Sequence, residues 1–207
     1  MSTGTIPAYG HGPAVATEAV PFSAGELYRM NVIEYERLVS LGALDDPRIE
    51  LIDGYLVRKM GKKPSHVWSV DATEMGLHSL LPAGWLIRRE SPVRVPEFDE
   101  PEPDLAVVKG TREDYKTRHP DPGDIGLLVD VAESSLDRDR GKKLQAYARS
   151  GVPVYWIVNL IDERIEVHTD PAIAGYRTRQ DYPRGTGAPV ILDGIERGCL
   201  RVDDLLP

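Results

Sequence analysis

Two long apolar runs separated by a helix-like segment constrain the fold most strongly. "GLLVDVA" (residues 126–132) and "VPVYWIVNL" (152–160) are rich in β-branched and apolar residues, which is typical of strands covered on both faces. Residues 136–150 between them predict a helix that Gly141 interrupts near its start and Gly151 ends. A strand, a helix and a second strand prefer a right-handed parallel crossover. We therefore expect an α/β fold, a mixed sheet with helices on at least one face.

The segment before this unit predicts a helix and a hairpin. Asn31 is placed to cap a helix near residues 31–41, with Glu34 as a reciprocal cap and Gly42 where the helix would stop. Two apolar-rich runs then flank Asp53-Gly54, the two-residue turn that a tight hairpin prefers.

A second helix is predicted within residues 65–84. Ser65 can cap its start, and Pro82 and Gly84 mark its end. The residues at helical spacing are Val67, Val70, Glu74, Leu77 and Leu81.

Further strands are predicted on both sides of the central unit, separated by a polar surface loop at residues 110–124. The predicted strands before the loop are "WLIRRE" (85–90), "PVRVP" (92–96) and "PDLAVVK" (103–109). Those after it are a hairpin around Asp162-Glu163 and the shorter runs "YRTRQ" (176–180) and "PVILDG" (189–194).

The size of 207 residues suits one substantial core, so we predict a single domain at residues 23–207. Residues 1–22 contain no Lys or Arg and no continuous apolar core, which favours a flexible arm over a secretory signal. No stretch approaches the roughly 20 apolar residues of a membrane-spanning helix, and we expect a cytoplasmic protein. The lone Cys199 excludes an internal disulfide; a small apolar filler is favoured over a reactive thiol.

Two acids stand inside the predicted strands. Asp104 and Asp130 each interrupt an apolar run, and an isolated carboxylate there is costly unless it is paired or bound to a cation. Either acid alone would more often lie at a strand end in water. Two acids in consecutive strands instead favour a shared site, with an Arg or Lys partner or with Mg²⁺ or Mn²⁺, whose retained waters make two carboxylates sufficient.

The helix after Asp130 adds an amine. Asp139, Lys143 and Tyr147 follow one another at intervals of four residues, on one helical face, and the short connection returns that helix to the strand of Asp130. Lys143 can therefore reach the two acids, although a surface ion pair with Asp139 is the alternative. Two carboxylates with an ammonium are suited to phosphodiester hydrolysis, because a metal lowers the pKa of bound water and the amine steadies the nucleophile or the developing charge.

Four segments carry a family resemblance: "EPDLAVV", "LLVDVAESSLDRDRGKKLQAYARSGVPVYWIVNL", "IELIDGYLV" and "SHVWSV". Together they resemble the putative restriction endonuclease group of the PD-(D/E)xK nuclease superfamily, over most of the chain. The resemblance implies a restriction endonuclease-like fold, with a mixed β-sheet core flanked by helices. It also implies a Mg²⁺- or Mn²⁺-dependent endonuclease that acts on nucleic acid, with DNA favoured, and no membrane partner.

The resemblance assigns roles residue by residue. Asp104 becomes the aspartate of the Pro-Asp element and Asp130 the acid of the (D/E)xK element, and both become metal ligands. Two positions after Asp130 the chain has Ala132 instead of Lys, and in this group the lysine is thought to come from the following helix, where Lys143 matches. Lys142 is the fallback, but it points about 100° away around the helix. The group usually has Glu where this chain has Asp130, and the shorter side chain changes the metal distance.

Further candidates surround these three. The resemblance makes Glu50 an additional metal ligand, with a salt bridge to Arg48 or Arg58 as the alternative. It places His66 near phosphate or a metal-bound water, and helix capping or plain exposure is the alternative. Tyr147 is a lower-ranked candidate on the face of Lys143.

Three neighbouring residues are assigned no functional role. Glu133 alternates away from Asp130, so it is predicted to face solvent. Tyr155 and Trp156 are predicted to be core residues and not to stack on bases.

Three functional interpretations stay open. The leading one is a metal-dependent endonuclease, although the net charge of −8 makes long-range attraction to DNA unexpected. The alternative is a catalytically silent nucleic-acid-binding or regulatory module on the same fold. A homodimer assembled through residues 175–207 is compatible with the first.

Overall fold

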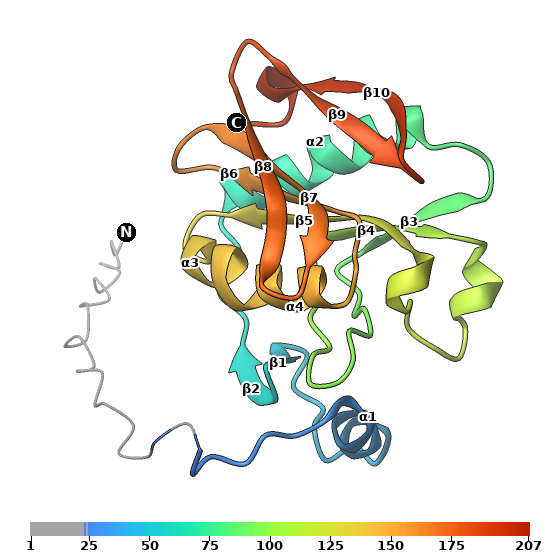
Figure 1. Cartoon of the computed structure of the whole chain (residues 1–207), viewed down its shortest axis with the longest axis vertical. Helices are drawn as coiled ribbons and strands as arrows, with labels where there is room; N and C mark the ends of the chain where they lie inside the picture. Colours follow the sequence, from blue (N-terminus) through green and yellow to red (C-terminus); the bar gives the residue numbers. More distant parts are fainter. Residues whose placement is uncertain (1–22, 24) are drawn as a thin grey trace, which may run out of the picture.

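A six-stranded mixed sheet lies at the centre of the computed structural model, which describes residue 23 and residues 25–207 (Figure 1). The predicted arm at residues 1–22 thus lies outside the described residues. The strand order is β3 (Trp85–Arg89), β4 (Leu105–Lys109), β5 (Ile125–Ala132), β6 (Val154–Asn159), β7 (Arg164–Ala172) and β8 (Gly175–Pro183). Only β5 and β6 pair in parallel, as the crossover prediction required. The expected mixed α/β sheet is confirmed.

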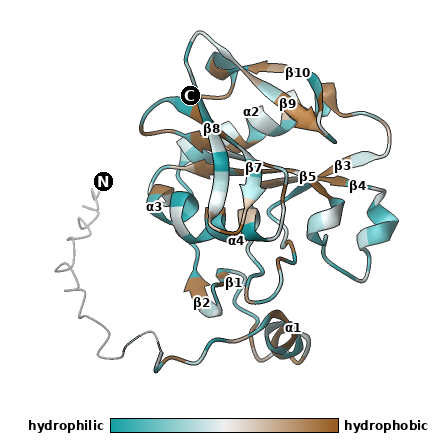
Figure 2. Cartoon of the chain, viewed as in Figure 1, coloured by the Kyte–Doolittle hydropathy of each residue, from teal (hydrophilic) through white to brown (hydrophobic). Residues whose placement is uncertain are grey.

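Each face of the sheet has its own cover. One apolar cluster joins the sheet to α2 (Pro64–Leu80) and to a separate hairpin of β9 (Gly187–Leu192) and β10 (Ile195–Arg201). A second cluster joins the opposite face to the helix that follows β5. Figure 1 shows these two layers on opposite sides of the sheet, and Figure 2 shows apolar residues concentrated along its central strands.

Alternation along β5 decides where its acid points. All eight residues of β5 are buried, as expected for a central strand. Leu127, Val129 and Val131 belong to the cluster on the α2 face, and Leu128 and Ala132 belong to the opposite cluster. Because successive side chains alternate between faces, the residue between Leu128 and Ala132 on the second face is Asp130.

The helix after β5 contains a wider turn. It runs as α3 (Leu136–Arg138), the π-helical turn η3 (Asp139–Lys143) and α4 (Leu144–Arg149), so the predicted interruption near Gly141 is a π turn. The N–H of Leu144 donates to the carbonyl of Asp139, five residues back. π turns occur frequently at functional sites, and this one carries buried Lys143.

The predicted first helix and hairpin are confirmed. α1 (Val32–Ser40) begins with the expected reciprocal cap, in which Glu34 N–H donates to Asn31 Oδ1 and Asn31 N–H donates to Glu34 Oε2, both at 3.0 Å. β1 (Ile49–Ile52) and β2 (Tyr55–Arg58) pair across the Asp53-Gly54 turn, whose residues have φ values of 52° and 78°. This two-stranded sheet is separate from the central one and lies between the α3–α4 layer and α1 in the view of Figure 1.

Some predictions about the second helix are wrong. α2 starts with Pro64, a favoured first residue, and Lys63 precedes it as an N-cap without a side-chain hydrogen bond, so Ser65 is not the cap. Val67 is partly exposed, whereas Val70 is fully buried as expected.

Two other segments differ from their predictions. Residues 92–96 form no strand, because a proline at each end removes ladder donors. Val93 and Val95 are nevertheless fully buried, and Val95 forms one isolated bridge with Asp99. Cys199 is exposed on β10 and is not a core filler.

The loop between β4 and β5 contains two short 3-10 turns, η1 (Arg112–Tyr115) and η2 (Pro122–Asp124), and a third, η4 (Val202–Asp204), follows β10. Among the described residues, no helix has both the length and the apolar character needed to cross a bilayer.

Candidate active site

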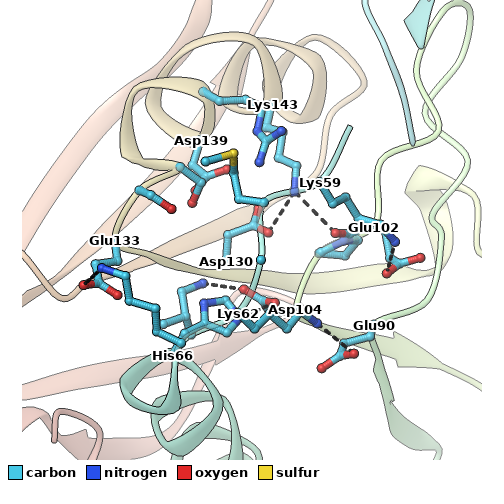
Figure 3. A pocket seen from close by; sticks show the side chains of 18 residues that line it. Lys59, Lys62, His66, Glu90, Glu102, Asp104, Asp130, Glu133, Asp139 and Lys143 are labelled. Carbon is cyan, nitrogen blue, oxygen red and sulfur yellow. Dashed lines mark hydrogen bonds and ion pairs between the residues drawn. The ribbon is translucent and has the colours of Figure 1, made fainter. Parts of the chain in front are cut away.

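A charged cleft opens where β5 ends, between the start of α2 and the turn η3 (Figure 3). Its walls include Asp104, Asp130 and Lys143, so the structure brings the three leading candidates together. The cavity volume is about 60 Å³. A single water needs only about 10–15 Å³ by this measure, so the cleft has room for an ion with waters.

Asp104 is positioned by its strand neighbour and by α2. It immediately precedes β4, and its Oδ2 accepts a 2.7 Å hydrogen bond from the backbone N–H of Val131 on β5. His66 Nε2, at the start of α2, lies 3.1 Å from Asp104 Oδ1. Burial raises the pKa of Asp104, but the contact with His66 and the Val131 hydrogen bond outweigh it and hold that pKa below its usual value. Asp104 is therefore the more readily ionised of the two strand acids.

Asp130 and Lys143 form a buried ion pair. Lys143 Nζ lies 3.0 Å from Asp130 Oδ1 and also donates to the carbonyl of Glu102 at 3.3 Å. The hydroxyl of Tyr155 donates to Asp130 Oδ2 at 2.8 Å. Burial raises the pKa of Asp130 to about 7, although the charge of Lys143 opposes it. The pKa of Lys143 lies well above its usual value despite burial, because Asp130 and then Glu50 favour its charged form.

The predicted preference for Lys143 over Lys142 agrees with the side-chain directions. Lys143 is only 4% exposed, whereas Lys142 keeps 61% of its side chain exposed and pairs with Asp53 at 2.8 Å. Neighbours in a helix point in different directions, so one lysine enters the cleft and the other leaves it.

His66 lies inside the cleft, so the alternative of an exposed histidine is wrong. Its contact with Asp104 raises the pKa of the imidazole, although burial opposes this. The histidine is thus biased toward the cationic form beside an ionised acid.

Glu50 lies behind the cleft. The buried carboxylate has Oε2 3.7 Å from Lys143 Nζ, accepts the Glu102 N–H at 3.1 Å, and has Oε1 3.7 Å from Arg138. Its cationic neighbours are therefore Lys143 and Arg138, not the Arg48 or Arg58 that the sequence alternative named. Glu50 does not line the cavity itself, but it contacts two cations that do, Lys143 and Arg138.

Tyr147 is not brought into the cleft. It is fully buried in the cluster on the α3–α4 face, edge-on to Tyr155 at 4.9 Å between ring centroids. Its hydroxyl has no hydrogen-bond partner among the described residues, and burial raises its pKa well above the usual value. Tyr155 is a core residue as predicted, but its hydroxyl also orients Asp130. Trp156 is fully buried, in agreement with its predicted core role.

Asp139 is a cleft residue that sequence reasoning treated only as a surface partner of Lys143. It is almost fully buried, lines the cavity and accepts a 2.6 Å hydrogen bond from the hydroxyl of Ser135. Burial raises its pKa. Its position four residues before Lys143 was the available signal, because such residues share a helix face.

Three lysines between β2 and α2 lie at the mouth of the cleft, and each pairs with an acid from another part of the chain. Figure 3 labels two of them, Lys59 and Lys62. The pairs are Lys59 with Glu102 at 2.6 Å, Lys62 with Glu90 at 2.8 Å and Lys63 with Glu133 at 2.7 Å. Glu133 reaches solvent as predicted, with 31% of its side chain exposed, but its carboxylate also accepts from Ser65 Oγ at 3.3 Å.

The strand acids suit a hard divalent cation. Each oxygen of Asp104 and Asp130 has a single hydrogen-bonding neighbour among the described residues, and a carboxylate oxygen has a second lone pair for an ion. No cluster of three or more His, Cys, Asp or Glu in that part of the chain is arranged for a metal. Two carboxylates with water completing the shell are a donor set of the kind that Mg²⁺ or Mn²⁺ accepts.

Known proteins resemble this chain in fold and in family. No curated protein matches it. The crystal structure of a putative nuclease belonging to DUF820 from Anabaena variabilis ATCC 29413 aligns with a TM-score of 0.63, covering 85% of this chain and 97% of that one. At 13% identity this likeness shows a shared fold. Together with the family match that follows, it agrees with the expected restriction endonuclease-like core. A model of the Uma2 family, "Putative restriction endonuclease", matches residues 32–200. The chain belongs to the Uma2 family.

Proposed function

We propose that the protein is an endonuclease that uses Mg²⁺ or Mn²⁺ to hydrolyse phosphodiester bonds, with DNA as the favoured substrate. The observation that supports this most directly is the convergence of Asp104, Asp130 and Lys143 in one solvent-connected cleft. The family and its nuclease-like structural neighbour support the same reaction class.

Asp104 and Asp130 would hold the metal. When bound, the metal would lower the pKa of a coordinated water and neutralise phosphate charge. The hydrogen bonds from Val131 N–H and from Tyr155 fix one oxygen of each acid, which orients both carboxylates before the substrate arrives. The raised pKa of Asp130 requires a compensating cation for full ionisation near neutral pH, which suits a metal ligand.

Lys143 acts as a charged donor in this proposal. Because its pKa lies well above the usual value, the ammonium keeps its proton and does not serve as a general base. It instead orients the attacking water and stabilises negative charge that develops on the phosphate. Glu50, 3.7 Å from Nζ, supports that charge from behind and is proposed here as a positioning residue for Lys143.

His66 is proposed to contact the phosphate. It lies on the cleft side of Asp104, and its raised pKa favours the imidazolium form that pairs with a phosphate oxygen. Binding of phosphate there would leave the Val131 hydrogen bond to hold Asp104 in place.

Incubation of supercoiled plasmid with Mg²⁺ or Mn²⁺ tests the proposal. The wild type should nick or linearise the plasmid, and Asp130→Ala and Lys143→Ala should not. Lys142→Ala is the matched control, because that exposed lysine belongs to the same turn and should leave cleavage unchanged. Cleavage that persists in both cleft variants, or a wild type that cleaves in neither metal, contradicts the proposal.

A second candidate is a catalytically silent nucleic-acid-binding or regulatory module. One observation favours it: both oxygens of Asp130 already have partners, Lys143 and Tyr155. Metal-independent retention of DNA without cleavage in either metal identifies this alternative. Assembly of two chains through residues 175–207 stays a separate prediction, to be checked by light scattering.

A further inference from the structure

The acid-paired lysines at the mouth of the cleft carry a further inference, which rests on the proposed function. Lys62 and Lys63 lie directly before α2, which places His66 in the cleft. Their ammonium groups contact Glu90, just after β3, and Glu133, just after β5. These two pairs tie the connection before α2 to two strands of the central sheet.

The Glu133 carboxylate occupies a position built for an anion. It accepts from Lys63 Nζ at 2.7 Å and from Ser65 Oγ at 3.3 Å, so an ammonium and a hydroxyl converge on its oxygens. A phosphate group offers the same acceptor oxygens and a negative charge. The hydrogen bond from Lys63 lowers the pKa of Glu133, which keeps this internal anion ionised.

The pairs are also accessible to a ligand. The Lys63 side chain is 63% exposed, and those of Lys62 and Glu90 are about one third exposed. Exposed ion pairs of this kind contribute little to stability and exchange partners readily. A polyanion that enters the cleft can therefore take over both lysines without disturbing the sheet.

We propose that Lys62, Lys63 and Ser65 form the site that holds the substrate backbone phosphates beside the bond to be cleaved, and that Glu90 and Glu133 occupy it in the free protein. The two acids then act as built-in competitors of nucleic acid. This arrangement accounts for a nucleic-acid cleft in a chain of net charge −8, because its cations are neutralised until the substrate displaces the acids.

Binding of a fluorescein-labelled 20-base-pair DNA duplex in EDTA, followed by anisotropy, tests this site without requiring cleavage. Glu133→Gln and Glu90→Gln should each tighten binding about fivefold at low salt, since each removes a charge that competes with phosphate. Lys62→Ala and Lys63→Ala should weaken binding and reduce the slope of log affinity against log salt by about 0.9 each.

Matched controls come from an exposed ion pair at the other end of β4. Lys109 and Asp193 lie 2.7 Å apart, and both side chains are about half exposed. Asp193→Asn changes the net charge as Glu133→Gln does, and Lys109→Ala matches Lys63→Ala. Both controls should change affinity by less than twofold. In addition, the gain from Glu133→Gln should largely disappear in a Lys63→Ala background, because the acid then has no lysine to release.

Each outcome bears on the proposal. A gain for Glu133→Gln no larger than that for Asp193→Asn, or one unchanged in the Lys63→Ala background, overturns it. Because Lys62–Glu90 and Lys63–Glu133 are tested separately, one misfolded variant does not decide the result. The melting temperature of each variant should stay near that of the wild type. If the wild type binds the duplex but cleaves no plasmid, only the proposed nuclease function is contradicted. If the cleft variants bind DNA no differently from the Lys109 and Asp193 controls while plasmid cleavage is intact, only this inference is contradicted.

Discussion

Two buried acids at the same level of the sheet have opposite surroundings. Asp130 on β5 and Glu166 on β7 both pair in register with Ile157 on the strand between them. The turn η3 supplies a cation to each, Lys143 to Asp130 and Arg140 to Glu166. Only the first acid lines the cleft.

The environment of Glu166 is complete. Arg140 contacts both carboxylate oxygens, with Nε 3.0 Å from Oε2, and Asn159 donates to Oε1 at 2.8 Å. Arg179 adds a contact at 3.4 Å. Burial alone would raise the pKa of Glu166, but His168, Arg140 and Asn159 together lower it.

The environment of Asp130 is incomplete by comparison. Its carboxylate contacts one cation, Lys143, and one hydroxyl, that of Tyr155. Burial and the nearby acids Asp139 and Asp104 raise its pKa to about 7. A buried acid with a full set of partners stabilises the fold, whereas one left short of positive charge is suited to take up a cation. We infer that Glu166 fixes the turn η3 and that Asp130 is free for chemistry.

The largest expected effect separates the two acids by activity. Asp130→Asn should lower plasmid cleavage by about 10³-fold, because a neutral amide cannot hold the divalent cation that activates water. Glu166→Gln should retain cleavage within a few-fold when rates are normalised to folded protein. Rates with Mg²⁺ and with Mn²⁺ check this, and equal losses in both variants would show that the two acids do not differ in role.

In stability, each substitution should cost what its abandoned cation loses. Glu166→Gln removes the carboxylate that Arg140 and Arg179 share, although Asp162 still pairs with the first and Asp181 with the second. The free energy of unfolding should fall by about 2 kcal/mol, a value reduced for these remaining pairs and for the partial exposure of both arginines. Asp130→Asn leaves the buried ammonium of Lys143 with Glu50, 3.7 Å away, as its nearest remaining acid and should lower the free energy of unfolding by about 3 kcal/mol. Urea unfolding in EDTA measures both. A cost near zero for Asp130→Asn would contradict its buried pair with Lys143.

A third buried acid tests whether missing partners are the cause of a raised carboxyl pKa. Glu100 is nearly fully buried, and its Oε2 has no hydrogen-bond partner among the described residues. Burial and then the charge of Glu36 raise its pKa to about 8. The stability tied to a raised pKa is present below the unfolded value, near 4.5, and is lost as the pH rises through about 8.

Glu100→Gln removes that loss. The variant should match the wild type at pH 4 and exceed its free energy of unfolding at pH 9 by about 2 kcal/mol. Urea unfolding across this range provides the measurement, with Glu166→Gln as the control of opposite sign. The lowered pKa of Glu166 stabilises the wild type above pH 4.5, so the deficit of that variant should stay constant from pH 9 to about 4.5 and shrink only below it. A pH-independent difference for Glu100→Gln would contradict the raised pKa of Glu100.

The two acids of the candidate site were predicted to lie together, and the structure places both in the cleft, although Asp104 immediately precedes β4 and does not lie inside it. Asp104 and Asp130 were located because an acid inside an apolar run is conspicuous and alternation fixes its face. The choice of Lys143 followed from its helical position relative to Lys142. These properties are local, so a single sequence contains them.

The remaining parts depend on contacts between distant segments. Ser65 and Glu133 lie 68 residues apart, and no local pattern indicates that they meet. Glu50 was a candidate ligand, but its contact with Lys143 depends on how the β1–β2 hairpin packs against η3. The π turn also escaped prediction, because Gly141 is compatible with several helix irregularities.

The smallest expected effect is stabilisation by the metal itself. Mg²⁺ that binds only the folded protein should raise the free energy of unfolding of the wild type by about 1.4 kcal/mol at ten times its Kd. Asp130→Asn should lose this increment, and Glu166→Gln should keep it despite its lower starting stability, because only Asp130 lies in the cleft. Melting temperatures with Mg²⁺ and with EDTA check both variants. The same measurement with Ca²⁺ tests metal binding without relying on cleavage. Equal stabilisation of the wild type and Asp130→Asn would place the cation elsewhere, and the contrast between the two acids would then reflect packing alone.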